Sequence, residues 1–358
     1  MNTSSSSSEG IVVTAVECNT PVGLNLEQTA AAIRAGLSGF VEFPFYMPIT
    51  REFDEGEDPI QVGSHGLIGG YDTNRLFDLI FEPITTLVQD SGLSRTEMTK
   101  GGIYFALPAG DEVTDKLKLR RNFLKQASSR LALPDTSEFL GVQTGSTGVF
   151  VLIERAVQKM MSGEMQFCII AAVDSYLLND RLAYYDENWR LKTDRNPEGF
   201  IPGEAGAVIL LETEEHARQR GVPGLLKIGG VSGGHEPNPV TGEKTSSGSG
   251  FTTAIRSLVE IQSETDSWKW VLSDLNGERY KAYEWGVILP RLNERITTDH
   301  HLSHMADSIG DVGAAMAAVQ LGCIAQSFKR NYAPADSALL LAGNDAGKRY
   351  AMTVSRAN

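Results

Sequence analysis

The sequence predicts an α/β fold built from two related halves. Short apolar runs typical of buried strands alternate with helical patterns, and the order of strand and helix begins again from residue 225. With 358 residues, the chain is long enough to bury a large core in both halves. We expect a flexible Ser-rich tail at 1–9, then halves at 10–222 and 223–358, with mixed sheets covered by helices on both faces.

The first half begins with a β-branched run and continues with alternating strand and helix patterns. The expected strands are 11–16, 101–106, 167–172 and 207–211, and the expected helices are 25–36, 71–90, 149–161 and 214–220. Asn25 and Gln28 have the spacing of a capping box, and Pro83 is expected to kink the second helix. Residues 40–70 show no clear period and are expected to be irregular. Residues 109–138 are expected to form a mostly polar helical excursion.

The second half repeats this order with fewer residues. The expected strands are 226–232, 270–274, 338–342 and 350–354, and the expected helices are 248–262 and 310–328. Trp268 and Trp270 are two residues apart, so we expect them to share one face of a strand, as core or dimer contacts.

Composition excludes several classes of function. The net charge of −13 argues against a nucleic-acid partner, and an acidic carrier would need a basic patch that the sequence does not plainly show. The three cysteines are far apart and form no CxxC pair, so we expect buried thiols, no metal site and no cofactor. The start lacks the basic and apolar regions of a signal peptide, and no apolar run could span a membrane. These features predict a cytoplasmic protein.

The most informative stretch is a small-residue turn, Gly141–Gly148, which leads directly into an apolar helix. A turn that points a helix N-terminus at a pocket is a common place for a nucleophile, because the exposed N–H groups stabilise negative charge. This turn offers Thr144, Ser146 and Thr147, but it contains no cysteine.

Several segments resemble β-ketoacyl-acyl-carrier-protein synthases. The resemblance is carried by Thr20-Pro-Val-Gly23 and Ala35-Gly-Leu-Ser-Gly39, by Asn196-Pro-Glu-Gly-Phe-Ile-Pro-Gly-Glu-Ala-Gly-Ala207, by Glu214–Gly221, and by Gly310-Asp-Val-Gly-Ala-Ala315. It covers the chain from residue 10 to 354, and the segment that ends at Ala207 is its most specific part. The implied fold is the thiolase-like αβαβα layered sandwich of an acyltransferase. The resemblance also implies a homodimer, a role related to fatty acid or polyketide biosynthesis, and an acyl carrier protein or another protein as partner.

The same resemblance implies that the catalytic residues are lost. Condensing members use a cysteine at the turn and two histidines. Here Gly145 stands at the cysteine position, or Thr144 or Ser146 if the register shifts by one residue. Asn276 stands in place of the first histidine, and Gly310 or Asp311 in place of the second. We therefore expect a catalytically degenerate homologue that acts as a scaffold, a partner subunit or an acyl-group binder.

An alternative is an acyl-thioester enzyme, an acyltransferase or hydrolase, that uses Ser146 or Thr144 as its nucleophile. Serine needs an adjacent base, and His304 is the best candidate among the six histidines, although a surface role is commoner for such a residue. The competing interpretation is that Ser146 or Thr147 only caps the following helix.

The remaining candidate residues are polar. Asp274, Asn276, Glu278 and Arg279 follow a strand, and they form either a binding site or an ion-paired turn. Glu204 is expected beside the turn, as a structural carboxylate that holds loop N–H groups. Asp311 is expected to partner a helix N-terminus, or to serve as a donor or acceptor in the old pocket. The predicted pocket thus contains Thr144, Gly145, Ser146, Glu204, Asn276 and Asp311.

Overall fold

The computed structural model describes residues 10–43, 60–64, 73–110, 114–115, 118–131, 138–262 and 267–357. Within these ranges no helix combines the length and the apolar character needed to cross a membrane.

Ten strands form one twisted sheet in which each half has the same strand order. The strands are β1 (Ile11–Asn19), β4 (Gly102–Leu107), β5 (Glu138–Gln143), β6 (Phe167–Ser175), β7 (Glu204–Thr213), β8 (Leu226–His235), β9 (Trp268–Ser273), β10 (Ile296–Ser303), β11 (Ser337–Gly343) and β12 (Lys348–Arg356). The first half runs β1-β7-β6-β4-β5 and the second β8-β12-β11-β9-β10, with matching parallel and antiparallel pairs. Only a short pairing of β1 with β8, Ile11–Val13 against Leu226–Ile228, joins them.

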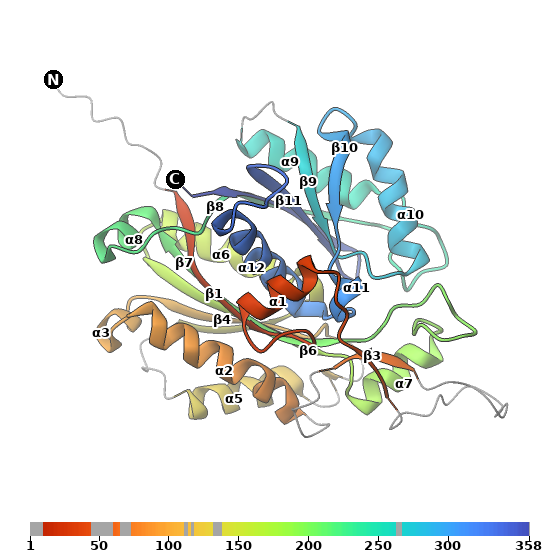
Figure 1. Cartoon of the computed structure of the whole chain (residues 1–358), viewed down its shortest axis with the longest axis horizontal. Helices are drawn as coiled ribbons and strands as arrows, with labels where there is room; N and C mark the ends of the chain where they lie inside the picture. The colour runs from red at the N-terminus through yellow and green to blue at the C-terminus, as the bar shows by residue number, and fades with distance from the viewer. Residues whose placement is uncertain are drawn as a thin grey trace.

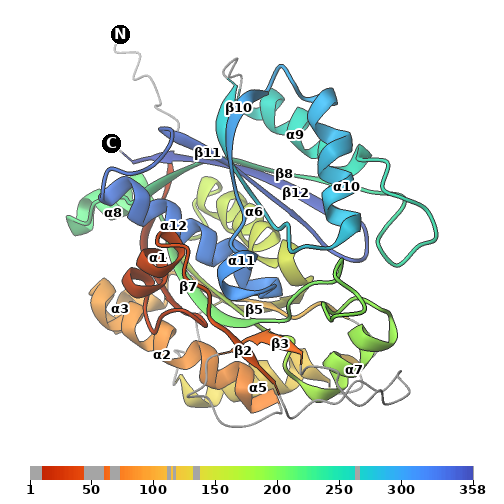
Figure 2. The ribbon, with the colours of Figure 1, turned by 45° about the vertical axis from the view of Figure 1, so that its right-hand side comes forward.

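Helices lie between the two half-sheets and on their outer faces (Figures 1 and 2). The helices are α1 (Leu26–Arg34), α2 (Thr73–Ser91), α3 (Arg95–Met98), α5 (Leu119–Arg130), α6 (Gly148–Met161), α7 (Asn179–Glu187), α8 (Glu214–Arg220), α9 (Ser249–Gln262), α10 (Arg279–Ile288), α11 (Ala306–Ile309) and α12 (Met316–Lys329). Helices α6 and α12 contact strands of both halves, whereas α2 and α5 cover one outer face and α9 and α10 the other. These five layers confirm the predicted layered sandwich.

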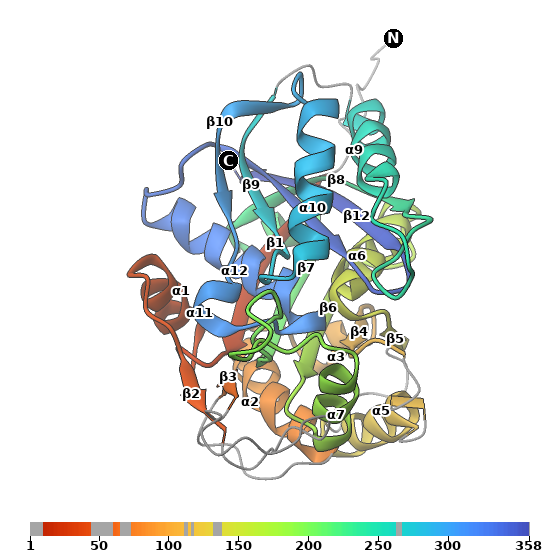
Figure 3. The same cartoon turned by 90° about the vertical axis from the view of Figure 1, so that its right-hand side faces the viewer.

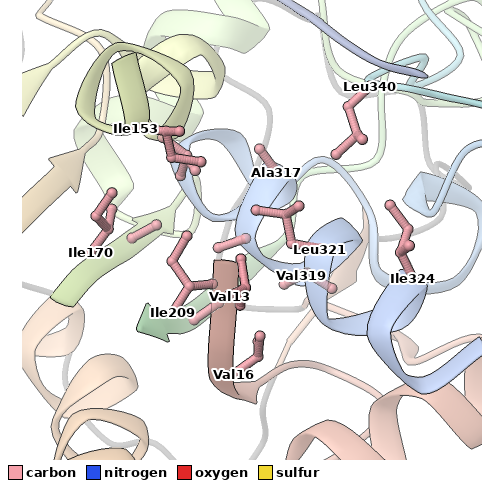
Figure 4. Packing of buried hydrophobic residues seen from close by; sticks show 14 of the residues in the cluster. Val13, Val16, Ile153, Ile170, Ile209, Ala317, Val319, Leu321, Ile324 and Leu340 are labelled. Carbon is pink, nitrogen blue, oxygen red and sulfur yellow. The ribbon is translucent and has the colours of Figure 1, made fainter. Parts of the chain in front are cut away.

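The central core explains why α12 is apolar and rich in small residues. Helix α12 is buried on all sides from Met316 to Phe328, because both half-sheets and α1 surround it. Figure 4 shows Val319 and Leu321 of this helix close to Val13 of β1. Because the helix is enclosed, apolar side chains all around it are buried, and each Å² of buried apolar surface stabilises the fold by about 25 cal/mol.

Several sequence predictions need correction. Residues 40–42 and 61–63 form a two-stranded hairpin, β2 (Phe40–Glu42) with β3 (Gln61–Gly63), inside the segment expected to be irregular. Strands β5 and β10 were not predicted, because they lie at the two ends of the sheet and only one of their long edges is paired. Edge strands are half exposed, so polar residues hide their pattern. Helix α2 contains Pro83 and continues beyond it, and the expected kink at this residue stays a prediction.

The two tryptophans of β9 do not share a face. Trp268 packs in the outer cluster with α9, whereas Trp270 packs in the central core. Trp268 is the first residue of β9, where the pairing with β10 shifts register after Ile296, so strict alternation does not hold there. Both side chains are buried.

Candidate functional site

The predicted turn is present and joins β5 to α6. A short 3₁₀ turn, η1 (Gly145–Thr147), follows β5 and leads into α6 at Gly148. Gly145 has φ +57°, a left-handed conformation that costs other residues about 1–2 kcal/mol. A Cβ added at Gly145 would lie 3.2 Å from the Cβ of Ala109. The backbone therefore has the shape of a nucleophile turn, and the residue at its apex is glycine.

Two hydroxyl groups of this turn, those of Ser146 and Thr147, bind backbone carbonyls, whereas the buried Thr144 Oγ1 has no hydrogen-bond partner among the described residues. Ser146 Oγ donates to the carbonyl oxygen of Gly343 at 2.7 Å, and Thr147 Oγ1 donates to that of Thr144 at 3.0 Å. Asn344 Nδ2 donates to the Thr144 carbonyl at 3.2 Å. Neither Ser146 nor Thr147 accepts an N–H of α6, so the expected capping role is wrong for both. Their hydroxyls instead fasten the turn to the β11–β12 connection.

A second turn of the same form precedes α12. This turn, η3 (Gly313–Ala315), begins at φ +47°, as the duplicated strand order leads one to expect. Its N–H groups already bind carboxylates: Ala314 N–H donates to Asp174 at 2.9 Å and Gly313 N–H to Asp311 at 2.8 Å. Burial raises the pKa of Asp174, although Arg181, 2.5 Å away, acts in the opposite direction. The chain's own anions therefore occupy this helix N-terminus.

Asn276 and Asp311, which stand where the resemblance places two histidines, are joined by a hydrogen bond. Asn276 Nδ2 donates to Asp311 Oδ2 at 2.6 Å and to Glu278 Oε2 at 3.0 Å, and its Oδ1 accepts the N–H of Glu278 at 3.1 Å. All three residues are buried. Since an amide nitrogen carries two hydrogens, both donors of Asn276 are already used.

Lys281 lies among these carboxylates. Its Nζ donates to the carbonyl oxygen of Asp274 at 3.0 Å and to its carboxylate at 3.2 Å, and it lies 3.8 Å from Asp311. Burial would lower the pKa of Lys281, but Asp274, Asp311 and Glu278 raise it well above its ordinary value. The ammonium group is therefore charged and neutralises this part of the site.

Arg190 closes the cluster from a different segment. Its guanidinium binds Glu278 through two hydrogen bonds of 2.7 and 2.9 Å and Asp345 at 2.5 Å. Burial would lower the pKa of Arg190, but Asp345 and Glu278 raise it far above its ordinary value; Arg190 in turn lowers the pKa of Asp345. Figure 3 shows the segment after α7 that carries Arg190 (green) lying below α10 and beside α11.

The hollow at this site is small. A cavity of about 20 Å³ is lined by residues of the cluster and by a neighbouring buried pair, Arg349 with Glu284 at 2.9 Å. This is about the space that one water molecule needs. The charges that line this hollow are held in pairs, and the predicted pocket residues Gly145, Asn276 and Asp311 do not line it.

The structure brings some predicted residues together and separates others. Asp274, Asn276 and Glu278 form the ion-paired turn that was one of the two interpretations, but Arg279 is 81% exposed and lies 3.8 Å from Glu198. Glu204 is fully buried at the same end of the sheet. It pairs with Arg75 of α2 at 2.5 and 2.6 Å and accepts a hydrogen bond from Ser175 at 2.9 Å, as a structural carboxylate; its expected hold on loop N–H groups stays a prediction.

His304 does not serve Ser146 as a base. Its Nδ1 lies 3.2 Å from Asp307, and it lines a groove with Arg34 and Trp270. Ser146 donates instead to Gly343. Gly310, the other residue aligned with the second histidine, has φ +74° and lies between α11 and η3.

Sequence reasoning missed the two buried cations and Asp345. Arg190 lies in the aromatic and charged stretch 184–190, and Lys281 follows Glu278 by three residues. Asp345 lies in the polar turn 343–347, which follows a strand. These charged residues are visible in the sequence. No local pattern shows, however, that Arg190 contacts Glu278 and Asp345, which are 88 and 155 positions further along the chain.

Comparisons with known proteins agree with this fold. No family model matches the chain. The polyketide biosynthesis malonyl-ACP decarboxylase PksF of Bacillus subtilis (strain 168) is 27% identical over an aligned length of 184 residues, and the match covers 42% of this chain and 44% of that protein. The chain thus spans less than half the length of the curated relatives it matches.

Two solved structures cover almost the whole chain. A type II polyketide ketosynthase, bound to a hexaketide and in complex with its acyl carrier protein, has a TM-score of 0.82 at 13% identity. The ishigamide ketosynthase/chain length factor has a TM-score of 0.77 at 14% identity. Each match covers 98% of this chain and 100% of the other. The fold is that of thiolase-like ketosynthases, and the curated relatives support kinship with this family.

Proposed function

We propose that this protein is a non-condensing, ketosynthase-like subunit that binds a carrier or partner protein. The observation that carries this proposal is the hydrogen bonding of Asn276. Decarboxylative condensation needs free donors that hold the developing enolate oxygen, and both donors of Asn276 bind Asp311 and Glu278. Gly145 supplies no nucleophile.

The charges of the site also disfavour an anionic intermediate. Asp311, Glu278 and Asp274 surround the place where an enolate would form, and Lys281 and Arg190 are already paired with them. The carboxylate of a malonyl group would be repelled by the same three side chains. We therefore do not propose for this chain the malonyl decarboxylase activity after which PksF is named. Like charges in a partly dry site repel each other strongly.

A basic helix offers a docking surface for an acidic carrier. Although the whole chain carries −13, the segment 118–131 holds five cations and no acid. Lys118, Arg120, Arg121 and Lys125 are exposed, whereas Phe123 packs against the sheet. Helix α5 also touches β5, which leads into the Gly145 turn. This local charge is a basic patch that the overall composition did not plainly show, and it fits an acyl carrier protein.

The open edge of β5 provides a place for a second subunit. Strand β5 pairs with β4 and is the last strand of the sheet among the described residues. We propose a homodimer across this edge, because an unpaired strand edge is a template for pairing with another chain.

Acyl transfer decides between this proposal and the alternative that Ser146 or Thr144 is a nucleophile. The protein would be incubated with acetyl-, malonyl- and longer acyl-thioesters, and intact mass and free thiol release would be recorded. We expect no adduct and no release above the buffer rate. A stable acyl adduct that disappears in Ser146→Ala or Thr144→Val would overturn the proposal.

Carrier binding tests the docking surface. We expect Arg120→Glu with Arg121→Glu to weaken binding of an acidic acyl carrier protein about tenfold or more at 50 mM salt. Lys329→Glu with Arg330→Glu is the matched control, because it reverses two adjacent exposed cations at the end of α12. Equal losses in both double variants would show only a general charge effect, and they would contradict docking at α5.

A further inference from the structure

A second hollow lies away from the site described above. A groove of about 560 Å³ opens between α1, the end of α12 and the inner face of strands β9 and β10. Figure 1 shows α1 against α12, with β9 and β10 beyond them. This volume is in the range of sites that bind small molecules.

The floor of the groove is apolar and fixed. Trp270 and Leu272 of β9 and Cys323 of α12 form it, and all three are buried. Trp270 meets Phe328 edge to face at 6.0 Å, and its Nε1 donates to Ser303 Oγ at 3.1 Å. Both contacts hold the indole in one orientation, so the floor presents a rigid aromatic surface.

The polar groups at the rim are mostly hydrogen-bond donors. Ser303 Oγ accepts the indole N–H, so its own hydrogen can be donated to a ligand. The guanidinium of Arg34 lies 4.1 Å from the centre of the Tyr332 ring, which positions it beside the opening. His301 is exposed at the rim, and His304 is held by Asp307 at 3.2 Å. Asp307, a carboxylate of the rim, is 77% exposed, so water screens its charge.

We propose that this groove binds a small amphipathic anion: a flat apolar group that carries one carboxylate. The apolar group lies over the indole of Trp270, beside the half-buried side chains of Ile33 and Tyr332, and the carboxylate is bound by Arg34 and the Ser303 hydroxyl. Arg34 is the specificity-determining residue, because a guanidinium binds a carboxylate in two-pronged geometry. This site does not depend on the proposed function.

The test uses 2-naphthoate as the probe and isothermal titration calorimetry as the measurement. We expect saturable one-to-one binding, weakened about tenfold by Arg34→Gln and changed less than twofold by Arg330→Gln, an exposed arginine of the neighbouring helix end. The neutral analogue 2-naphthamide should also bind about tenfold more weakly. Far-UV circular dichroism confirms that each variant is folded, and Trp270→Phe should remove the fluorescence quenching caused by the probe.

Three results would overturn the proposal. The first is the absence of saturable naphthoate binding at millimolar concentration. The second is equal affinity of the wild type and Arg34→Gln, or an equal loss in Arg330→Gln, which would show unspecific charge attraction. The third is equal affinity for naphthamide, which would identify an apolar face for a protein partner rather than an anion site.

Discussion

Removing the buried ammonium of Lys281 gives the sharpest test of how the site is held together. In Lys281→Met the side chain keeps a similar length, but the carboxylates of Asp274 and Asp311 lose the cation that lies 3.2 and 3.8 Å from them. Lys281 is 16% exposed on its side chain, so water replaces little of this interaction. Breaking one partner of a buried ion pair costs about 3–5 kcal/mol.

This cost translates into a measurable shift in melting temperature. The entropy of unfolding is about 2.1 cal/mol/K per residue, so 358 residues give about 0.75 kcal/mol/K. Dividing about 3–5 kcal/mol by this value lowers the Tm by about 4–7 °C. Differential scanning fluorimetry at pH 7 measures the shift. The matched control is Lys329→Met, whose pair with Glu27 at 3.6 Å is exposed, and we expect a loss of about 0.5 kcal/mol or less.

The pH dependence of this loss follows from the direction of the pKa shift. The pKa of Lys281 is raised in the folded state, so its contribution is fully present below the unfolded value near 10.4 and is lost as the pH rises through the folded value. The difference between wild type and variant should therefore stay constant from pH 7 to 10. A loss below about 1 kcal/mol at pH 7, or one no larger than that of the control, would refute the claim that buried charge pairing holds the site.

Three further substitutions test the two helix N-termini and the rim of the cluster. Gly145→Cys should cost about 1–2 kcal/mol in urea unfolding, because position 145 is buried and left-handed, and it should not restore condensation measured with malonyl-thioesters. Gly313→Ala should cost more than about 3 kcal/mol in urea unfolding, because its Cβ would lie 2.1 Å from Asp174 Oδ2. Gly163→Ala has no atom within 4 Å, so it should cost only the conformational strain of about 1–2 kcal/mol. Asp345→Asn should cost about 1 kcal/mol at pH 7, since its side chain is 33% exposed. The loss should vanish as the pH falls through the lowered pKa of Asp345, measured by acid unfolding.

The sequence predicted the layers and the Gly145 turn because their signals are local. Buried strands such as Phe167–Ser175 are continuous apolar runs, and a turn of small residues before an apolar helix is visible without any partner. The edge strand Ile296–Ser303 escaped prediction, because Thr, Asp and His interrupt its pattern on the exposed side. Side chains on the exposed side of this strand contact water, so they are not restricted to apolar residues.

The candidate site was predicted only in part, because its charge pairing is long-range. Asp274, Asn276 and Glu278 lie next to one another, and their clustering could be expected from the end of one strand. Arg190 reaches Glu278 and Asp345 from a loop that precedes β7, and only the folded chain shows this contact. The sequence allowed a binding site or an ion-paired turn at these three residues. The ion pairs depend on Arg190, whose position near them the sequence does not show.

The duplicated architecture shows how the proposed loss of catalysis can leave the fold intact. Each half directs a helix N-terminus toward the centre from a turn with a left-handed glycine, Gly145 or Gly313. Before α12, Asp174 and Asp311 accept the exposed N–H groups, so charge balance there is internal. Before α6, the Ser146 hydroxyl fastens the turn to the carbonyl of Gly343 and no anion is required. A condensing enzyme must keep at least one such N-terminus open for a thiolate and an enolate, and an open polar site costs stability. Here the chain's own carboxylates bind the N-terminus of α12, and hydroxyl-to-carbonyl hydrogen bonds hold the turn before α6 without a side-chain cap on its N–H groups. This arrangement fits the proposed subunit, whose role is to present surfaces such as α5.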